Sequence, residues 1–242
     1  MIVVKAGKRD IVNEAFRVLR TNFEFTIGTH PEQNVIVFTS FNPGSGKSHI
    51  AANMAMSLAI KKKKVLLIDG DLRHGSTSML IHSPGEGLSD YLNGRIADIH
   101  DILYKGEENG LVKNFDVIPI GTIPPNPSEL LFTPLLEQMI KTMREEYDYV
   151  FIDCPPIEVV ADTPIYEQFA DRTIFVVRAG LMERSMLPEV NALYKEKKFK
   201  NMTLILNGTK AHGGRYGSHY GYGYGYGYGY NYNKEKNGGA KS

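Results

Sequence analysis

The stretch Val-Ile-Val-Phe-Thr-Ser-Phe-Asn-Pro-Gly-Ser-Gly-Lys-Ser, residues 35–48, decides how the chain folds. Its first five residues form a strand-like run, and a turn containing proline and glycine follows. Residues 48–60 are then compatible with a helix. A strand, a glycine-containing turn and a helix in this order form the setting that a phosphate-binding loop requires.

The residue types in this turn suit the binding of a nucleotide. Gly44 and Gly46 let backbone N–H groups close around phosphate oxygens, Lys47 supplies positive charge to the β- and γ-phosphates, and the Ser48 hydroxyl is a ligand for magnesium. Phe41 departs from the general pattern, which has a glycine there, so an ordinary glycine-rich turn is the alternative. The residues expected to bind the nucleotide are Gly44, Ser45, Gly46, Lys47, Ser48 and His49.

Further strands and helices are predicted by the distribution of apolar residues. Strand-like runs occupy residues 65–68, 149–152, 173–177 and 203–206, and helical patterns occupy residues 11–25, 129–147 and 184–198. The apolar face of the first helix consists of Val12, Ala15, Phe16, Leu19 and Phe23, and its other face carries Glu14, Arg17 and Arg20. Strands that alternate with helices indicate a mostly parallel sheet with helices on both faces. We therefore expect an α/β fold of the P-loop NTPase type.

Aspartates stand directly after two of the predicted strands. Asp69 and Asp71 follow the run at 65–68, and Asp153 follows the run at 149–152. Open parallel sheets bind ligands at this edge, so the three carboxylates are expected to converge on the phosphate loop. A helix cap at Asp69 or Asp71 and a simple strand end at Asp153 are the structural alternatives. Together with Lys47 and Ser48, in the expected order along the chain, they favour a nucleotide-binding site.

Composition limits the other classes of function. The formal net charge of the 242 residues is +1, which gives no global field that favours nucleic acid. Cys154 is the one cysteine, so no internal disulfide is possible and a reducing cytoplasm is the expected compartment. No apolar run approaches the length of about 20 residues that crosses a bilayer. Attachment to a membrane would need a partner or a segment removed from the chain.

The composition changes abruptly after Lys210. Glycine and tyrosine dominate the rest of the chain, which has too little aliphatic surface to offset its ordering entropy. We expect one folded domain at residues 1–210 and a flexible tail at residues 211–242, with a self-associating interaction tail as the alternative. Eight of the fourteen tyrosines lie in this tail: Tyr216, Tyr220, Tyr222, Tyr224, Tyr226, Tyr228, Tyr230 and Tyr232.

These motifs resemble those of the bacterial tyrosine kinases that control synthesis and export of capsular and exopolysaccharides. The resemblance covers nearly the whole chain. It includes the phosphate loop, Asp-Gly-Asp-Leu-Arg at 69–73, Asp153 with its two prolines, residues 121–131, and Val-Arg-Ala-Gly at 177–180. Glu14, Arg17 and Arg20 are similar to the family's Glu-x-x-Arg-x-x-Arg oligomerisation motif. Gly75, where many relatives have proline, is a small departure.

The resemblance implies an activity and roles for residues. It implies a protein-tyrosine kinase that uses ATP and magnesium and phosphorylates, in trans, the tyrosine cluster of its own tail. Lys47, Asp69 and Asp71 are the implied catalytic residues, and the implied magnesium site consists of Ser48, Asp69, Asp71 and Asp153. Asp69 is nominated as the base with Asp71 as its partner, two roles that the sequence does not separate. Asp153 acts through a bound water, and Asn207 matches a position that contacts adenine, although a strand-end turn explains Asn207 nearly as well.

The resemblance also implies partners. These are other copies of the chain in a ring, a transmembrane activator of the polysaccharide co-polymerase type, and a cognate tyrosine phosphatase, but no nucleic acid. The expected location is the cytoplasmic face of the cell membrane. Two alternatives remain: a partitioning or division-site ATPase, which usually has a second lysine at the position of Asn42, and a nucleotide-binding interaction module without catalysis.

Overall fold

A parallel sheet forms the centre of the protein. The computed structural model describes residues 2–27, 32–81, 85–158 and 162–209, so the predictions for the tail lie outside the described residues. Within that part, the sheet has six strands in the order β3-β2-β4-β1-β5-β6, all paired in parallel. The strands are β1 (Val35–Ser40), β2 (Val65–Asp69), β3 (Phe115–Ile118), β4 (Tyr149–Asp153), β5 (Arg172–Arg178) and β6 (Thr203–Asn207).

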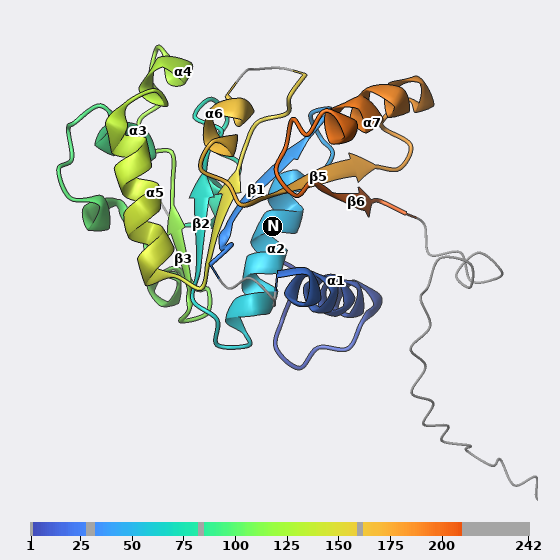
Figure 1. Cartoon of the computed structure of the whole chain (residues 1–242). Coiled ribbons are helices and arrows are strands. Elements are labelled where there is room, and N and C mark those ends of the chain that lie inside the picture. The colour runs from blue at the N-terminus through green and yellow to red at the C-terminus, as the bar shows by residue number, and fades with distance from the viewer. Residues whose placement is uncertain (1, 28–31, 82–84, 159–161, 210–242) are drawn as a thin grey trace, which may run out of the picture. The chain divides into compact units, whose positions relative to one another are not determined.

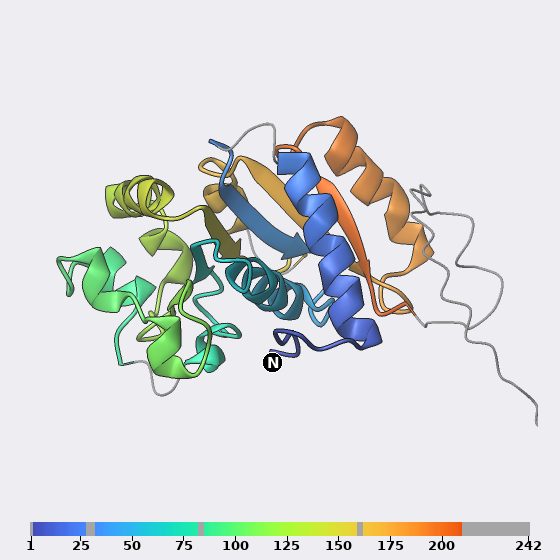
Figure 2. The ribbon, with the colours of Figure 1, turned by 90° about the horizontal axis from the view of Figure 1, so that it is seen from below.

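Helices cover both faces of this sheet (Figures 1 and 2). Helices α1 (Ile11–Ile27) and α2 (Lys47–Ala59) pack on one face. The other face carries α3 (Leu88–Leu92), α5 (Pro134–Glu146), α6 (Thr163–Glu167) and α7 (Leu187–Lys195). The remaining elements are α4 (Pro127–Leu130) and the short 3₁₀ turns η1 (Ser78–Leu80), η2 (Ile99–Ile102), η3 (Gly106–Asn109) and η4 (Arg184–Met186). None of the described helices is long and apolar enough to cross a membrane.

The central strand, β1, begins with an uninterrupted apolar run, residues 35–38, because helices cover both faces of the sheet. Ile36 and Phe38 of β1 pack against the α1 and α2 side, whereas Val35 and Val37 pack against the opposite helices. Because both faces are covered, alternation of apolar and polar residues is absent. The prediction of a parallel α/β sheet is therefore confirmed.

The predicted helix at residues 129–147 is wrong in its extent. Helix α4 ends at Leu130, and a separate helix, α5, begins at Pro134. Proline at the first turn of a helix costs nothing, because its missing N–H has no partner there in any case. Likewise, the pattern at 184–198 forms the 3₁₀ turn η4 followed by α7, which ends at Lys195.

Strand β3 and the buried face of α1 were not predicted correctly. Strand β3 has four residues with Asp116 among them, too short a run to be recognised. In α1, Phe16 and Phe23 are buried as predicted, but Val12 is exposed, and the polar residues Asn13 and Arg20 lie on the buried face. The packing of α1 is therefore partly polar.

Candidate active site

Two aspartates end adjacent strands at one edge of the sheet. Strand β4 lies between β1 and β2, and its Asp153 is in register with Asp69 of β2 and with Phe38 of β1. Strand β1 continues beyond this point into the loop that leads to α2. The order of the strands therefore brings Asp69, Asp153 and the loop to the same edge, where parallel sheets bind ligands.

The loop has the backbone conformation of a phosphate-binding turn. Gly44 and Gly46 have φ angles of 74° and 91°, a left-handed region that side chains disfavour. Lack of space is a second reason for glycine at position 46, because a Cβ atom there would lie 2.3 Å from the Asn207 Nδ2 atom. Helix α2 starts at the next residue, Lys47. The predicted order of strand, loop and helix is confirmed.

Three hydrogen bonds fix carbonyl groups of this loop. The Ser45 hydroxyl donates to the Asn42 carbonyl at 2.8 Å, the Asn207 amide donates to the Ser45 carbonyl at 2.9 Å, and the Arg178 guanidinium donates to the Gly44 carbonyl at 2.8 Å. Side-chain donors therefore satisfy these three loop carbonyls, and backbone N–H groups of the loop are not used for that purpose. Arg178 lies in the stretch at 177–180 that matches the family, but no role was predicted for it, since nothing local shows that the end of β5 reaches the loop.

Phe41, the departure from the general loop pattern, anchors the base of the loop. Its side chain is buried in a small apolar cluster with Phe175, Val190 and Phe199. A glycine would not supply this packing. Phe41 therefore helps to position the loop. The other buried members of its cluster are not predicted site residues.

The two strand-end carboxylates are fully buried and incompletely paired. Asp69 Oδ2 accepts hydrogen bonds from the Ser78 backbone N–H and hydroxyl, each at 2.7 Å. Asp69 Oδ1 and both carboxylate oxygens of Asp153 have no hydrogen-bond donor among the described residues. Buried oxygens without a partner are rare in proteins and mark places where a ligand or ion supplies the contact.

Burial also changes the acidity of both carboxyl groups. It raises the pKa of Asp69, and the Ser78 hydrogen bonds oppose that change. Burial raises the pKa of Asp153 to about 7, although the Lys47 cation and the nearby Ser48 hydroxyl both lower it. Both of these opposing causes require Lys47 and Ser48 to lie close to Asp153.

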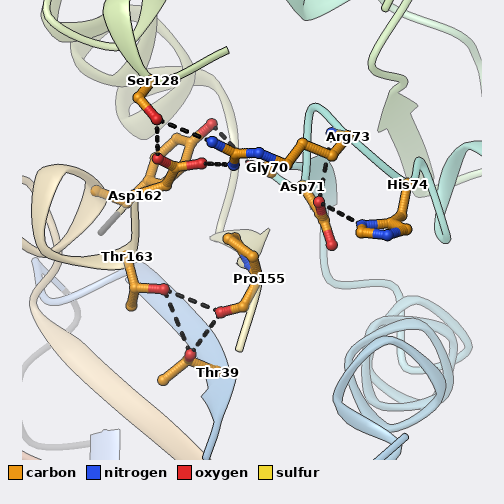
Figure 3. Close-up of polar contacts among 10 residues, drawn as sticks. Thr39, Gly70, Asp71, Arg73, His74, Ser128, Pro155, Asp162 and Thr163 are labelled. Carbon is orange, nitrogen blue, oxygen red and sulfur yellow. Dashed lines mark hydrogen bonds and ion pairs between the residues drawn. The ribbon is translucent and has the colours of Figure 1, made fainter. Parts of the chain in front are cut away.

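Asp71 follows Asp69 by two residues in the chain. It is nearly buried, and its Oδ1 atom accepts a hydrogen bond from the Arg73 backbone N–H at 3.3 Å and lies 3.3 Å from His74 Nδ1 (Figure 3). His74 itself is largely exposed. The structure thus places Asp71 two residues after the end of β2, immediately before the turn at residues 72–74.

The donor set fits a hard cation that also binds phosphate. Within the described ranges, no group of three carboxylate, imidazole or thiolate side chains is arranged to hold a metal without other ligands. Magnesium in phosphoryl-transfer sites is usually bound by one or two carboxylates together with waters and substrate phosphates. Unpaired carboxylate oxygens beside Lys47 and Ser48 match that requirement.

A second polar cluster joins three separate segments around this edge. Arg73 forms an ion pair with the buried Asp162 and donates to the Ser128 hydroxyl at 3.0 Å, and Ser128 donates to Asp162 at 2.6 Å (Figure 3). Ser128 belongs to α4, and Asp162 precedes α6. The cluster therefore ties the Asp-Gly-Asp-Leu-Arg turn to both neighbouring segments.

The three charged residues of α1 were predicted to lie on one side of the helix, but they do not share an exposed side. Glu14 and Arg17 form an ion pair at the surface, and Arg17 also donates to the Lys8 carbonyl at 2.6 Å. Arg20 is only 8% exposed and donates to the carbonyl and the hydroxyl of Ser57 in α2, each at 3.0 Å. Arg20 therefore holds two helices of the same chain together, and this part of the expectation needs correction.

Comparisons with known proteins agree with this geometry. A family model described as an AAA domain matches residues 33–181. The tyrosine-protein kinase CpsD of Streptococcus agalactiae is 34% identical over 208 residues, covering 85% of this chain and 87% of that protein. The chain belongs to the bacterial tyrosine kinase family. The solved kinase domain of the Escherichia coli tyrosine kinase ETK superimposes with a TM-score of 0.73 at 33% identity, covering 88% of this chain and 80% of that domain.

Not all members of this tyrosine kinase family have the same length. The putative tyrosine-protein kinase AmsA of Erwinia amylovora is 36% identical over 187 residues, which are 77% of this chain, but the match spans only 24% of AmsA. The septum site-determining protein MinD of Pyrococcus horikoshii, complexed with Mg-ADP, has a TM-score of 0.58 at 24% identity, covering 72% of this chain and 69% of MinD. That likeness shows a shared fold, and the kinases match better in both identity and TM-score than the division-site ATPase does.

Stability measurements distinguish the two arginines of α1. We predict that Arg20→Met lowers the free energy of unfolding by about 2 kcal/mol, because the buried Ser57 carbonyl and hydroxyl lose their donor. Arg17→Met should cost less than about 1 kcal/mol, since its ion pair with Glu14 is partly exposed. Urea denaturation measures both. Equal losses in the two variants would contradict the structural role of Arg20.

The cluster around Asp162 can be tested by a double-mutant cycle. Arg73→Gln should lower the free energy of unfolding by about 2 kcal/mol or more, because the buried Asp162 carboxylate loses its counter-ion. Asp162→Asn in the Arg73→Gln background should cost much less than it does alone. Additive losses in urea denaturation would show that the two residues do not interact.

Proposed function

We propose that the protein transfers the γ-phosphoryl group of ATP to tyrosines of its own tail and thereby regulates capsular or exopolysaccharide synthesis and export. The observation that carries this proposal is the position of Asp69 and Asp153, in register on adjacent strands and beside the loop that begins α2. The tail supplies the tyrosine acceptors. The curated relatives named as tyrosine-protein kinases support the same reaction.

The residues of the chain would act mainly by positioning and by charge. Phosphoryl transfer passes through a loose transition state that needs alignment and positive charge more than covalent assistance. Backbone N–H groups of residues 44–48 and the Lys47 ammonium group would bind the phosphates, and Ser48, Asp69, Asp71 and Asp153 would hold magnesium, Asp153 through a water. Bound magnesium would neutralise charge that develops on the transferred group.

The acceptor tyrosine must lose a proton during the transfer. A phenol has a pKa near 10, so a carboxylate close to its oxygen is the suitable proton acceptor. We assign this role to Asp69, with Asp71 as its partner. Asp69 Oδ2 is held by Ser78, which orients the carboxylate, and Asp69 Oδ1 has no donor among the described residues.

The arrangement of the tail sequence suits transfer between copies. Glycine alternates with tyrosine from residue 220 to residue 230, so several registers would present a phenol to the site. A glycine-rich chain of about 30 residues spans roughly 30 Å, enough to reach a neighbouring molecule. We propose a ring of copies in which each tail enters the neighbour's active site, and in which accumulated phosphate then weakens the assembly by repulsion.

Partners and location belong to the same proposal. A transmembrane activator of the polysaccharide co-polymerase type would bring the ring to the cytoplasmic face of the membrane, and a tyrosine phosphatase would reset it. Contacts between copies would use the exposed Glu14 and Arg17 of α1, while Arg20 would support the helix from within. Asn207, which holds the loop, would also lie close to the adenine.

A mixture of two variants tests transfer between copies. The first variant, Lys47→Met with an intact tail, lacks the loop cation and should be inactive, because transition-state charge is no longer stabilised. The second is active but truncated after Lys210, so it has no acceptor tyrosines. We expect phosphate on tail tyrosines of the first variant, measured by phosphotyrosine mapping by mass spectrometry.

The controls are each variant alone, which should yield no tail phosphotyrosine. If the two proteins co-assemble, ATP is consumed and the tail remains unmodified, the proposal of transfer between copies is wrong. ATP hydrolysis without any phosphotyrosine in the wild-type protein as well would instead favour an ATPase of the partitioning type.

A further inference from the structure

A basic pocket lies at the opposite end of β5 and β6 from the active site. It has a volume of about 640 Å³ and is formed by Arg172 at the start of β5, the end of α7 and the segment that leads into β6. The active-site contacts Arg178 and Asn207 lie at the other ends of the same two strands. Helix α7 and strand β6 both lie beside β5, at one edge of the sheet (Figure 1). The pocket is therefore separate from the phosphate loop.

Arg172 is a buried cation with no counter-ion among the described residues. Its side chain is 9% exposed, and it forms no ion pair with a carboxylate of the described residues. Its Nη atoms make contacts of 3.5 Å to two carbonyls and a hydroxyl, and its Nε atom has no hydrogen-bond partner in the described part of the chain. Burial lowers the pKa of Arg172. An anion in the pocket would compensate this charge.

Lysines surround Arg172 at the rim of the pocket. Lys195 and Lys197 are exposed, and neither is ion-paired with a carboxylate among the residues described. Lys200 already donates to the Gln168 carbonyl at 2.8 Å. Lys197 has a φ angle of 53°, a left-handed position just past a helix that glycine usually occupies. A lysine there costs about 1 kcal/mol relative to glycine, and it leaves a cation beside the pocket.

The other walls of the pocket are aromatic or apolar. Tyr194 is 62% exposed beside the pocket, and Phe199 and Met202 also line it. None of the residues that line the pocket is acidic. A lipid headgroup or an inorganic anion would contact only the cations of the pocket. A ligand that joins an aromatic ring to a phosphate group would use the aromatic walls as well.

We propose that this pocket binds phosphotyrosine, presented by the phosphorylated tail of a second copy of the chain. The inference rests on the proposed function, since that reaction would produce the ligand. Charge distinguishes the two forms of the tail. Residues 210–242 contain five lysine and arginine residues and one glutamate, so the unmodified tail is cationic and is not attracted to the pocket. Each phosphate adds roughly −1.5 to −2 charges, so phosphorylation at several tyrosines makes the net charge of the tail negative.

The consequence is a contact between copies that forms only after the reaction. A product tail bound at this pocket would lie against the neighbour at the end of the sheet opposite the phosphate loop. It would thus be kept away from the neighbour's active site, which would remain open to unmodified tyrosines. This contact would be separate from the ring contacts proposed for Glu14 and Arg17, which repulsion between phosphorylated tails would weaken.

A second basic pocket on the chain is a weaker candidate and serves as the control. It has a volume of about 360 Å³ and lies between residues 4–7, α1 and the end of α2, with Lys61 and Lys62 at its rim. Its arginines, Arg17 and Arg20, are already engaged by Glu14 and Ser57. It has no aromatic wall. Lysines near the last turn of a helix are expected there in any case, because they interact with its free carbonyls.

The test is direct binding of synthetic tail peptides to the full-length chain. The protein carries Lys47→Met so that its own tail stays unmodified, and the peptide spans residues 216–232 with either tyrosine or phosphotyrosine at residue 224. Fluorescence anisotropy should show the phosphotyrosine peptide binding at least about tenfold more tightly than the unmodified peptide. Lys195→Ala with Lys197→Ala should lose about tenfold in affinity, whereas Lys61→Ala with Lys62→Ala should retain it.

Three results would overturn the proposal. The first is equal binding of the phosphorylated and unmodified peptides, and the second is equal loss of affinity in the two double variants. The third is capture of the protein on phosphatidylserine vesicles, dependent on Lys195 and Lys197, without binding of the phosphopeptide, which would assign the pocket to a membrane surface. Because the peptide is synthesised with its phosphate, failure to bind refutes the pocket and leaves tail phosphorylation itself intact.

Discussion

The burial of two carboxylates at the ends of adjacent parallel strands is the constraint on which the site depends. Asp69 and Asp153 are in register, and neither is exposed to solvent. Desolvation disfavours their charged forms, as the raised pKa values of both groups show. Lys47 is the cation that acts on Asp153 within the chain, and a bound divalent ion would add to it. The arrangement is therefore costly unless the edge of the sheet binds a cation.

The rest of the structure holds the phosphate loop against this pair. Asn207 and Arg178 come from the ends of the last two strands and bind loop carbonyls, and Phe41 fixes the start of the loop in a separate apolar cluster. On the other side, Arg73 joins the turn after β2 to the segments that contain Ser128 and Asp162. Residues separated by more than a hundred positions thus determine the shape of one edge of the sheet.

The sequence predicted the parts of the site that depend on local order. The run before Phe41 and the glycines after it predicted a strand and a phosphate loop, and the rule for parallel strand ends predicted that Asp69 and Asp153 would meet. Contacts between distant segments were not predictable in this way. The burial of Arg20 depends on Ser57 in another helix, and the pairing of Arg73 with Asp162 depends on the docking of α6. Strand β3 was missed because four residues with a central aspartate give no periodic signal.

In the proposed reaction, the carboxylate edge, with magnesium, directs phosphate from ATP to tyrosines of the tail. Mapping of modified residues tests it most directly, when the wild-type full-length protein is incubated with ATP and magnesium and, in parallel, with ATP and a chelator. We expect phosphotyrosine within residues 216–232 in the first sample and none in the second. Equal modification in the presence of the chelator, or phosphate confined to tyrosines outside the tail, would contradict it.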